Sequence, residues 1–516
     1  MRYKIRSEIT FLVFILLTLF FVVSCTSKTK NTPPNIIVFL VDDMGLMDTS
    51  VPFLTDTSGT LKKYPLNNYY ITPNMEKLAK QGIRFTNFYA HSVCSPSRVS
   101  ILTGQNSARH RVTTWIKPTD NNRSKFGPTN WNWSGLTKKS VTLPRILQQA
   151  GYKTIHVGKA HFGPFNSEGA NPLNLGFDVN VAGSAIGRPG SYLGTEGYGK
   201  FAGDSVRAVP GLDKYHGKNI FLTEALTLEA NLAISQAKEE GKPFFLNMSH
   251  YAVHSPFYID QRFAENYRDS GMSEASQAYA TLIEGIDKSL GDIIQHVKKL
   301  GLGNNTLILF LGDNGSDAPL PIENNYSSSS PLKGKKANCW EGGMRVPFIA
   351  SWVKPNKKAY AQKKLPIAQN AIQQQMGSVL DIFSTLSQLA DVSVSKYHIT
   401  DGFDLNKQLR GQKNDKRDEL FLNHYPHTHR SSYYTSLVKS SWKVIYHYPI
   451  QQQPRYELFN LKEDPFEANN LADKNPKQLK TMMKALADEL KNKKALYPEK
   501  EKLPLQLMVN IPLTSS

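Results

Sequence analysis

A cysteine followed at fixed offsets by a proline and an arginine is the strongest indication of chemistry in this sequence. Cys94, Pro96 and Arg98 stand in the stretch CSPSRVSILTG, which ends at Gly104. A reactive or metal-binding cysteine usually comes with a second cysteine or a histidine at close spacing, and this stretch contains neither. The alternative is a buried structural cysteine before a helix. The complete pattern predicts a specialised use of Cys94.

Two polar pairs end apolar stretches that we predict to be buried strands. Asp42 and Asp43 follow the first stretch, and Asp313 and Asn314 follow a later one. Three carboxylates and one amide form an all-oxygen set, which suits a hard cation, Ca²⁺ before Mg²⁺. Isolated pairs of this kind are commonly turn or cap residues. Because both pairs follow buried strands, with Cys94 between them in the sequence, we expect them to bind one cation.

Further basic side chains lie in short motifs where they could bind an anion or move a proton. Lys159 and His161 are two residues apart in VGKAH and would project from the same side of an extended segment. His254 ends the motif HYAVH, whose first residue, His250, we interpret as structural. Lys336 lies in LKGKKANCWEGGMRVP. Without the other motifs, each of these would be an ordinary loop residue.

These motifs, in this order, resemble those of the type I sulfatases of the alkaline phosphatase superfamily. The resemblance implies that a formylglycine-generating enzyme oxidises Cys94 to formylglycine (3-oxoalanine). It implies one bound Ca²⁺ per chain, with the ligands Asp42, Asp43, Asp313, Asn314 and the modified Cys94. It implies catalytic roles for Cys94, Arg98, Lys159, His161, His254 and Lys336. The sequence departs from the family at Ala160, where an aromatic residue is usual, and this affects the expected local packing.

The reaction implied by the resemblance is hydrolysis of a sulfate ester on a carbohydrate (EC 3.1.6.-). His254 would be the acid for the leaving sugar oxygen, and His161 the base that lets the aldehyde return. The overall similarity to carbohydrate sulfatases favours a polysaccharide fragment that contains galactose or N-acetylgalactosamine. Candidate substrate contacts are Arg188, His427, His429 and Arg430, which would otherwise be surface-loop residues. The sulfate position and the choice between endo and exo action stay open.

Two other functions fit parts of the same pattern. The formylglycine apparatus also occurs in phosphonate and phosphodiester hydrolases. A lipoprotein that binds sulfated glycans, with an unconverted Cys94, is the non-enzymatic alternative, although a binder would not need both His161 and His254. The tryptophans that follow the cysteine motif could stack on sugar rings or serve as packing residues: Trp115, Trp131 and Trp133.

Hydrophobic patterning predicts the elements that must position these residues. Continuous apolar runs, typical of strands buried on both faces of a parallel sheet, occupy residues 35–41, 154–157, 244–248, 307–311 and 347–352. Helical patterns lie at 75–81, 275–300 and 376–389. This alternation predicts an α/β sandwich with the site at the carboxyl ends of the strands, and the resemblance implies a large sandwich like that of alkaline phosphatase.

The pattern changes beyond about residue 401. Short alternating segments at 433–439, 442–448 and 455–461 precede an amphipathic stretch at 476–494. We therefore predict a catalytic domain over residues 35–400 and a smaller C-terminal subdomain over 401–516, made of an antiparallel sheet and a helix.

The N-terminus has the pattern of a bacterial lipoprotein signal. Residues 1–24 combine a basic start with an apolar stretch too short for a typical membrane span, and Cys25 follows as the lipidation site. Residues 25–34 would be a tether. A transmembrane anchor is the alternative. We expect a protein of the cell envelope, lipid-anchored to the membrane and facing the periplasm or the cell exterior.

Charge and cysteine content agree with this interpretation. The formal net charge of +19 suits an anionic partner such as a sulfated glycan, and no motif for nucleic-acid binding accompanies it. With Cys25 lipidated and Cys94 oxidised, Cys339 would be the one remaining thiol, so we expect it to be a packed structural residue with no disulfide. The oligomeric state stays open.

Overall fold

The computed structural model describes residues 32–56, 58–320, 328–450 and 455–507. The predicted signal peptide, the lipidation site Cys25 and nearly all of the tether lie outside these residues. Within the described residues, no helix combines the length and the apolar character needed to span a membrane. Residues 34–516 form one compact unit.

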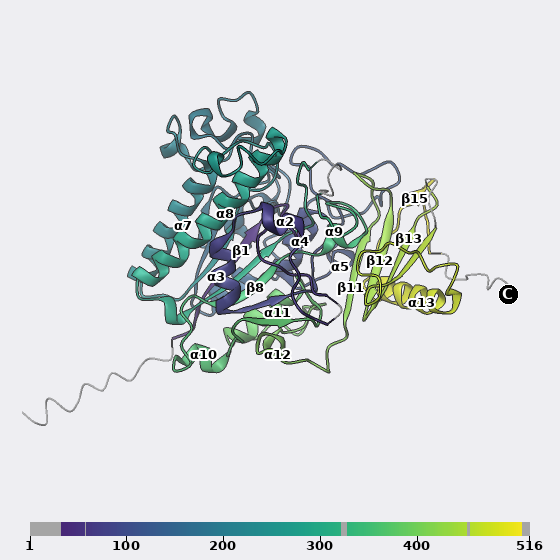
Figure 1. Ribbon diagram of the computed structural model, residues 1–516. Helices are drawn as coiled ribbons and strands as arrows, with labels where there is room; N and C mark the ends of the chain where they lie inside the picture. The colour runs from purple at the N-terminus through teal and green to yellow at the C-terminus, as the bar shows by residue number, and fades with distance from the viewer. Residues whose placement is uncertain (1–31, 57, 321–327, 451–454, 508–516) are drawn as a thin grey trace, which may run out of the picture. The chain divides into compact units, whose positions relative to one another are not determined.

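The centre of the unit is an eight-stranded sheet (Figure 1) with the strand order β5-β4-β6-β1-β7-β8-β2-β9. The five strands from β5 to β7 are mutually parallel. The strands are β1 (Asn35–Val41), β2 (Ile83–Phe85), β4 (Lys153–Gly158), β5 (Val179–Val181), β6 (Phe244–Ser249), β7 (Thr306–Gly312), β8 (Phe348–Trp352) and β9 (Ala371–Gln373).

The sheet is mixed, which corrects the expectation of a parallel sheet. Strand β8 runs antiparallel to both β7 and β2, and β2 pairs with β9 in parallel. The apolar run of β8 shows only that both faces of the strand are buried, and burial does not determine strand direction. All five predicted strands are present. The short strands β2, β5 and β9 lacked a pattern long enough to predict them.

Helices cover both faces of the sheet and make the core two-sided. Alternate residues of β1 face opposite layers: Ile37 and Phe39 pack with residues of α3, α7 and α8, whereas Ile36 and Val38 pack with residues of α4, α6 and α11. The first set of helices runs together on one side in Figure 1. The helices are α3 (Pro73–Gln81), α4 (Cys94–Thr103), α6 (Leu143–Gln149), α7 (Leu222–Glu239), α8 (Glu274–Lys299) and α11 (Asp381–Leu389).

The helix expected at 376–389 is shorter than predicted. Residues Gly377–Ser378 form the short strand β10, which pairs with β3 (Phe88–Tyr89), and α11 begins only at Asp381. Asp381 accepts hydrogen bonds from the backbone of Ser378 and Phe403, so the apolar residues before it belong to a strand and a turn. The other two predicted helices agree with α3 and α8 to within two residues.

The C-terminal part forms a second, antiparallel sheet covered by a helix. Its strands are β11 (Leu420–Tyr425), β12 (Tyr434–Lys439), β13 (Trp442–His447) and β14 (Tyr456–Asn460), in that order, and α13 (Pro476–Asn492) packs on them. Leu479, Met483 and Leu486 of α13 join the core of this sheet. The predicted sheet and helix are confirmed, with β11 as an additional strand. The exact boundary at residues 400/401 stays a prediction.

Short elements complete the described chain. They are α2 (Pro65–Tyr69), α5 (Ser107–His110), α9 (Glu341–Met344), α10 (Tyr360–Lys364), α12 (Asn406–Leu409), β15 (Glu499–Lys500), β16 (Leu503–Pro504) and the 3₁₀ turns Glu168–Ala170, Pro172–Leu175, Gly194–Gly199, Ser205–Arg207, Asp213–Tyr215, Ala264–Asn266 and Gly303–Asn305.

Candidate active site

The candidate site lies where four parallel strands reach their carboxyl ends. Asp42 follows β1, Lys159 follows β4, the segment with His254 follows β6, and Asp313 follows β7. These strands are neighbours in the sheet, so residues far apart in sequence meet at one edge. Backbone hydrogen bonds from Asp42 N to Ala252 O (3.0 Å) and from Asp313 N to Val41 O (3.2 Å) hold three of these loops together.

The three carboxylates form one buried cluster. Asp42, Asp43 and Asp313 are each 0% exposed, and one oxygen of each lies within 4.8 Å of the others. Asp43 N donates to Asp313 Oδ1 (3.0 Å), and Asn314 Nδ2 donates to Asp43 Oδ1 (2.9 Å). The amide nitrogen of Asn314 is thereby used within the cluster, which leaves its oxygen as the possible ligand.

The donor set of this cluster fits a hard cation. Asn314 Oδ1 is buried and has no hydrogen-bond partner in the described structure. A buried oxygen without a partner is costly unless a cation or water satisfies it. Together with three carboxylates, this oxygen gives the all-oxygen coordination that Ca²⁺ prefers. The sequence prediction that Asp42, Asp43, Asp313 and Asn314 lie together is therefore supported by their geometry.

Arg98 ties the cysteine helix to the acidic cluster. Its Nε donates to Asp313 Oδ2 (2.8 Å), and its Nη2 lies 3.4 Å from Asp42 Oδ1. Its Nη1 donates to Ser249 Oγ (2.6 Å) and to the carbonyl of Lys159 (2.9 Å). This arginine is 1% exposed and therefore links the ends of β1, β4, β6 and β7 to α4.

Cys94 is the first residue of α4 and lies inside the site. It is 3% exposed, and burial raises the pKa of its thiol. A thiol held protonated in this way is a poor nucleophile, because the thiolate is the reactive form. The surroundings of Cys94 therefore do not favour direct thiol catalysis, and the unmodified side chain does not explain the acids and bases around it.

His161 is oriented toward Cys94 by a backbone carbonyl. Its Nε2 lies 2.6 Å from the oxygen of Ile116, which can only accept, so Nε2 carries the proton. Nδ1 is then an acceptor, 3.4 Å from Cys94 Sγ and 3.2 Å from Ser95 Oγ. Burial and the charge of Lys159 lower the pKa of His161, which favours the neutral ring. His161 therefore presents a base to the side chain of residue 94.

The local backbone differs from the predicted extended segment. Strand β4 ends at Gly158, and His161 has a φ of 58°, in the left-handed region. Lys159 and His161 both face the site, but toward different groups. Lys159 Nζ contacts both oxygens of Asp42 (2.8 and 2.7 Å), whereas His161 contacts residues of α4.

Lys336 and His254 approach the cluster at Asp43. Lys336 Nζ lies 2.6 Å from Asp43 Oδ2, and His254 Nε2 lies 3.5 Å from the same oxygen. Burial alone would raise the pKa of Asp43, but Lys336, His254 and Lys159 outweigh it and hold this pKa below its usual range. With Arg98, the two lysines supply three positive charges around three carboxylates.

His254 has one ring nitrogen free for chemistry. Its Nδ1 contacts the carbonyl of Ser255 (2.9 Å) and so carries a proton, while Nε2 faces the site. Tyr192 donates its hydroxyl to the carbonyls of Tyr251 (3.0 Å) and His254 (2.7 Å) and holds this loop in place. Burial and Lys336 lower the pKa of His254, and a bound anion would act in the opposite direction.

The four predicted substrate contacts do not form a single group. His429 lies beside Trp115, and Arg430 pairs with Asp317, which follows the residue whose carbonyl accepts from Lys336 N, so these two residues border the site. Arg188 pairs with Asp204 at 3.4 Å and is partly exposed. The expectation for His427 is corrected: it is 1% exposed, contacts Thr113 Oγ1 (2.9 Å) and is not available to a substrate.

Packing explains two of the three tryptophans. Trp131 is buried, donates to Asn121 Oδ1 (2.9 Å) and packs edge-on against His427. Trp133 donates to the carbonyl of Lys117 (3.1 Å). Trp115 instead lies beside His429, with ring centroids 5.6 Å apart, in the segment whose next residue contacts His161. Only Trp115 is placed where it could meet a sugar.

Several residues that shape the site carried no signal of their own. Ser95 accepts from the backbone of Ile116 (3.1 Å) and contacts His161, although its position inside the cysteine motif could have marked it. Ser249 ends β6 and binds both Arg98 and the carbonyl of Lys159. Gly187 lies so close to His161 that a Cβ would be 2.7 Å from its ring.

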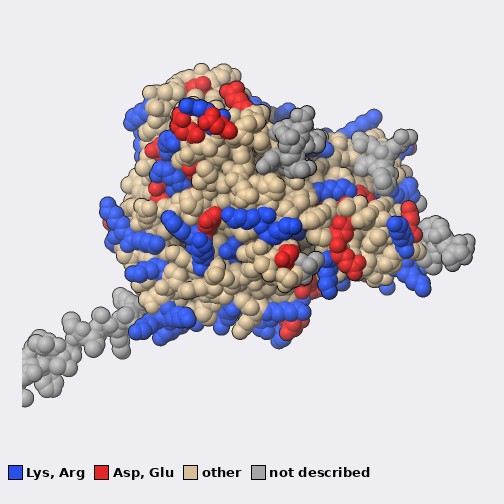
Figure 2. Space-filling model, viewed as in Figure 1, with Lys and Arg blue, Asp and Glu red and all other residues tan. Residues whose placement is uncertain are grey.

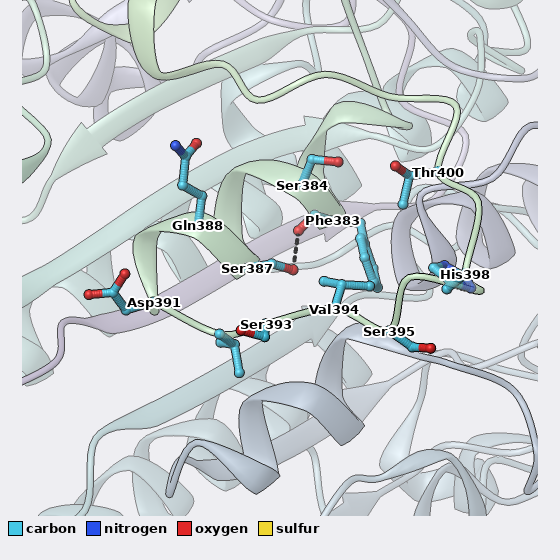
Figure 3. A pocket seen from close by; sticks show the side chains of 11 residues that line it. Phe383, Ser384, Ser387, Gln388, Asp391, Ser393, Val394, Ser395, His398 and Thr400 are labelled. Atoms are coloured by element: carbon cyan, nitrogen blue, oxygen red, sulfur yellow. Dashed lines mark hydrogen bonds between the residues drawn. The ribbon is translucent and has the colours of Figure 1, made fainter.

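Other surface features do not coincide with the site. A hollow of about 450 Å³ lies beside α11 (Figure 3), and its eleven lining residues, which lie between Phe383 and Thr400, do not belong to the site described above. Figure 2 shows lysine and arginine spread over much of the visible face, in keeping with the net charge of +19. The expected structural role of Cys339 agrees with its burial at 2% exposure.

Most of the chain is similar to known proteins. A sulfatase family profile matches residues 34–392, and a profile described as N-sulphoglucosamine sulphohydrolase, C-terminal, matches residues 335–495. N-acetylgalactosamine-6-sulfatase of Mus musculus is 30% identical over 403 residues, covering 74% of this chain and 68% of the relative. Arylsulfatase G of Rattus norvegicus is 27% identical over 526 residues, covering 91% and 89%.

Among solved structures, the complex of Ps i-CgsB with k-i-k-neocarrahexaose has the same fold. Its TM-score is 0.70 at 22% identity, and the match covers 92% of this chain and 95% of the other. The chain belongs to the sulfatase family, whose members typically use Ca²⁺ and formylglycine. More particularly, the protein is a sulfuric ester hydrolase, EC 3.1.6.-, with an acidic candidate metal site at Asp42, Asp43 and Asp313.

Proposed function

We propose that the protein removes sulfate from a sulfated carbohydrate, with Cys94 converted to formylglycine and Ca²⁺ bound by Asp42, Asp43, Asp313 and Asn314. One observation carries the proposal. The side chain of residue 94 enters a buried site where His161 Nδ1 lies 3.4 Å away and three carboxylates are matched by three cations. Such a site suits the transfer of an anionic group, whereas the chemistry of an isolated thiol would not require these surrounding charges.

Two groups supply chemistry that the twenty amino acids lack. Formylglycine at residue 94, once hydrated, would supply one hydroxyl as the nucleophile toward sulfur and a second hydroxyl whose deprotonation would allow release of sulfate and return of the aldehyde. Ca²⁺ at the acidic cluster would neutralise charge on the sulfate oxygens. Because the aldehyde is regenerated, the net reaction consumes one water and yields one alcohol and one sulfate.

The residues of the chain bind the sulfate and move two protons. Lys159 and Lys336 approach the acidic cluster from different loops and would be the cations on the sulfate oxygens. With a sulfate anion bound, His254 would carry a proton on both ring nitrogens and would give the Nε2 proton, which faces the site, to the leaving sugar oxygen. His161 Nδ1, already an acceptor, would take the proton from residue 94.

A carbohydrate substrate is supported by the surroundings and by the relatives. The mouse relative is by name an N-acetylgalactosamine-6-sulfatase, and a structural neighbour is in complex with k-i-k-neocarrahexaose. Trp115, His429 and Arg430 at the border of the site offer an aromatic ring and charged donors for a sugar. We therefore propose a galactose- or N-acetylgalactosamine-containing polysaccharide fragment as the substrate.

A panel of defined sulfated mono- and oligosaccharides tests the substrate. We expect sulfate release from galactose- or N-acetylgalactosamine-type sulfates, and turnover of glucosamine sulfates alone would contradict the sugar assignment. Matched nitrophenyl sulfate, phosphodiester and phosphonate substrates test the reaction class. Faster hydrolysis of the phosphorus esters would favour the phosphodiesterase alternative.

Mass spectrometry of the peptide that contains residue 94 tests the nucleophile. In protein from the native host we expect formylglycine at this position. A fully unmodified thiol in protein that shows no sulfatase activity would favour the glycan-binding alternative.

Substitution of the proposed cation and acid tests the catalytic assignments. Lys336→Ala and His254→Ala should each lower kcat by about 10²–10³ or more, because each removes a group that acts on developing charge. Lys439→Met is a suitable control, since Lys439 is a partly exposed lysine at the end of β12. Near-normal turnover of either variant, with residue 94 modified, would overturn that assignment.

We also propose that the chain is a lipoprotein of the cell envelope, anchored through Cys25. The basic start, the apolar stretch and the cysteine that follows support this. In the native host, the wild type should label with radioactive palmitate and sediment with membranes, and Cys25→Ser should do neither. Membrane sedimentation of Cys25→Ser without label would favour the transmembrane alternative.

A further inference from the structure

Three buried charges join the C-terminal sheet to the segment that carries Lys336. Lys443 Nζ lies 2.7 Å from Glu467 Oε1 and 3.0 Å from Glu341 Oε1, and all three residues are 0% exposed. Glu467 Oε2 also accepts from the backbone N of Glu341 (2.6 Å). None of these groups touches the acidic cluster in the contacts described above, so their role needs a separate explanation.

The three residues come from different parts of the fold. Lys443 lies on β13, Glu467 follows β14, and Glu341 is the first residue of α9. Burying charged groups is costly unless each is paired, and here Lys443 lies between the two carboxyl groups while Arg345 Nη1 lies 3.6 Å from Glu341 Oε2. Their contacts therefore hold α9 against the C-terminal sheet at one defined place, since a small displacement would leave a buried charge unpaired.

Short α9 is in turn held against the catalytic part of the molecule. Glu341 Oε2 accepts from the hydroxyl of Tyr89 (2.8 Å) on β3. Gly315, directly after Asn314, donates its N–H to the carbonyl of Gly343 (3.0 Å). A Cβ on Gly315 would lie only 2.1 Å from the carbonyl of Gly342, so the two backbones are in direct contact.

The segment before α9 carries Lys336 and also contacts the loop that leads into α4 and Cys94. Lys336 N donates to the carbonyl of Ser316 (2.9 Å), and Ala337 N donates to that of Ser92 (2.7 Å). Backbone hydrogen bonds therefore connect α9 to the loop that follows Asp313, this loop to Lys336, and the residue after Lys336 to Ser92, which precedes Cys94 by two residues. Lys443 and Glu467 hold this set of contacts from the C-terminal side.

We propose that Lys443 and Glu467 are positioning residues through which the C-terminal sheet fixes Lys336 and the Asp313–Asn314 loop relative to Cys94. The proposal rests on the proposed function, because Lys336 acts there as a cation on the sulfate. It assigns to the C-terminal sheet a direct part in the geometry of the site, in addition to covering the core.

A positioning role differs from a purely structural one in what a substitution changes. Loss of a structural contact lowers the melting temperature and leaves the folded enzyme active. Loss of a positioning contact lowers kcat and the affinity for Ca²⁺ at temperatures where the variant is folded, because displacement by about 1 Å can cost about 10²-fold in rate.

The experiment uses the full-length, modified enzyme and two variants of the charge cluster formed by Lys443, Glu467 and Glu341. Lys443→Met removes the central charge, and Glu467→Gln breaks one contact while leaving the Lys443–Glu341 pair. Lys439→Met is the matched control, because Lys439 is 42% exposed and lies 3.9 Å from exposed Asp418. For each protein we measure the kinetics with nitrophenyl sulfate. We also measure the Ca²⁺ midpoint, which is the Ca²⁺ concentration that gives half of the maximal increase in melting temperature.

We expect a fall in kcat of at least about tenfold for Lys443→Met and Glu467→Gln, with KM changed less than about threefold, and a higher Ca²⁺ midpoint. Lys439→Met should match the wild type. If Lys443 acts through Lys336, the loss in kcat for Lys336→Ala/Lys443→Met should be well below the product of the two single losses.

The proposal would be overturned if folded Lys443→Met or Glu467→Gln had the wild-type kcat and an unchanged Ca²⁺ midpoint. It would also be overturned if the loss in kcat of the double variant equalled the product of the two single losses. If Lys443→Met does not fold, Glu467→Gln decides. Failure of the proposed function looks different: the modified wild-type enzyme would then release no sulfate from nitrophenyl sulfate, whereas the Ca²⁺ midpoints of the Lys443 and Glu467 variants would still report whether these residues position the Asp313–Asn314 loop.

Discussion

His161 shows how a single backbone contact can prepare a side chain for a reaction. The carbonyl of Ile116 fixes the proton on Nε2 and so leaves Nδ1 as an acceptor toward residue 94. A neutral ring is favoured by burial and by Lys159. The protonation state needed for a base is therefore set before any substrate binds.

Replacement of His161 should affect turnover more than binding. His161→Ala removes the base near residue 94, and we expect kcat to fall by about 10²–10⁴ with little change in KM. Steady-state kinetics with nitrophenyl sulfate provide the measurement. His296→Ala, at a half-buried position of α8 where the ring contacts Ser235 Oγ (2.8 Å), serves as the control. Equal kcat for both variants would show that another group takes the proton.

Asn314 should report on the metal through its unpartnered oxygen. Asn314→Leu removes that oxygen at similar volume, so the Ca²⁺ concentration needed to raise the melting temperature should increase about tenfold or more. Removal of Ca²⁺ from the wild type by a chelator should lower the melting temperature, since saturating ligand at 100 times its Kd adds about 2.7 kcal/mol.

The control for Asn314 is Asn231→Leu, because Asn231 also has a buried side-chain oxygen with no partner in the described structure, but lies on α7. This variant should keep the wild-type Ca²⁺ midpoint. An unchanged midpoint in Asn314→Leu would remove Asn314 from the set of ligands.

At the scale of elements, the sequence was most informative where a long buried strand ends. Asp42 and Asp313 could be placed together because β1 and β7 have unmistakable apolar runs, and parallel neighbours end at one edge. The short strands β2, β5 and β9 could not be predicted, since three residues carry no periodicity. The burial of His427 could not be predicted, because the sequence of a polar loop does not show that Trp131 packs against this side chain.

The contact between the Asp313 loop and α9 should not tolerate a side chain. In Gly315→Ala the new Cβ would meet the carbonyl of Gly342 at 2.1 Å, so one backbone must move. We expect the free energy of unfolding to fall by about 1–3 kcal/mol and kcat to fall as well. Denaturant unfolding and kinetics measure the two effects.

Gly285→Ala provides the comparison for this prediction. Gly285 lies within α8, and a Cβ there would be 3.5 Å from its nearest neighbour, an ordinary contact. Alanine should be neutral or raise the free energy of unfolding by about 0.5–1 kcal/mol. If Gly315→Ala behaves like Gly285→Ala, the two loops are not in tight contact.

At the scale of the whole molecule, a buried carboxyl group outside the site should make stability depend on pH. Asp48 is 0% exposed, and its Oδ2 accepts from Gly45 N (2.8 Å) and from the hydroxyl of Tyr279 (2.9 Å). Burial raises its pKa to about 7 from an ordinary value of 3.8, although these hydrogen bonds oppose the shift. The folded state therefore holds this proton more tightly than the unfolded chain does.

The sign of the pH dependence follows from this difference. Between about pH 4 and pH 7 the folded state carries more protons at Asp48, so the free energy of unfolding should fall as pH rises through this window and level off above it. Over this window, the free energy of unfolding of the wild type should fall by up to about 4 kcal/mol more than that of Asp48→Asn. Urea unfolding at several pH values measures this.

Asp415→Asn, at an exposed position, should follow the wild type across the same pH range. If wild type and Asp48→Asn have parallel pH profiles, Asp48 does not hold a proton in the fold. Neither Asp48 nor the Lys443 cluster could be predicted from sequence, because their importance depends on burial by segments far away in the chain.

The depth at which Cys94 lies sets an order of events in time. Cys94 is 3% exposed, Arg98 is 1% exposed, and both belong to a formed helix under the loops of the site. A second enzyme that has to read Cys94, Pro96 and Arg98 cannot reach them in the folded protein. The proposed conversion of Cys94 would therefore have to happen on the nascent or unfolded chain, and the yield of active protein would depend on the relative rates of folding and modification.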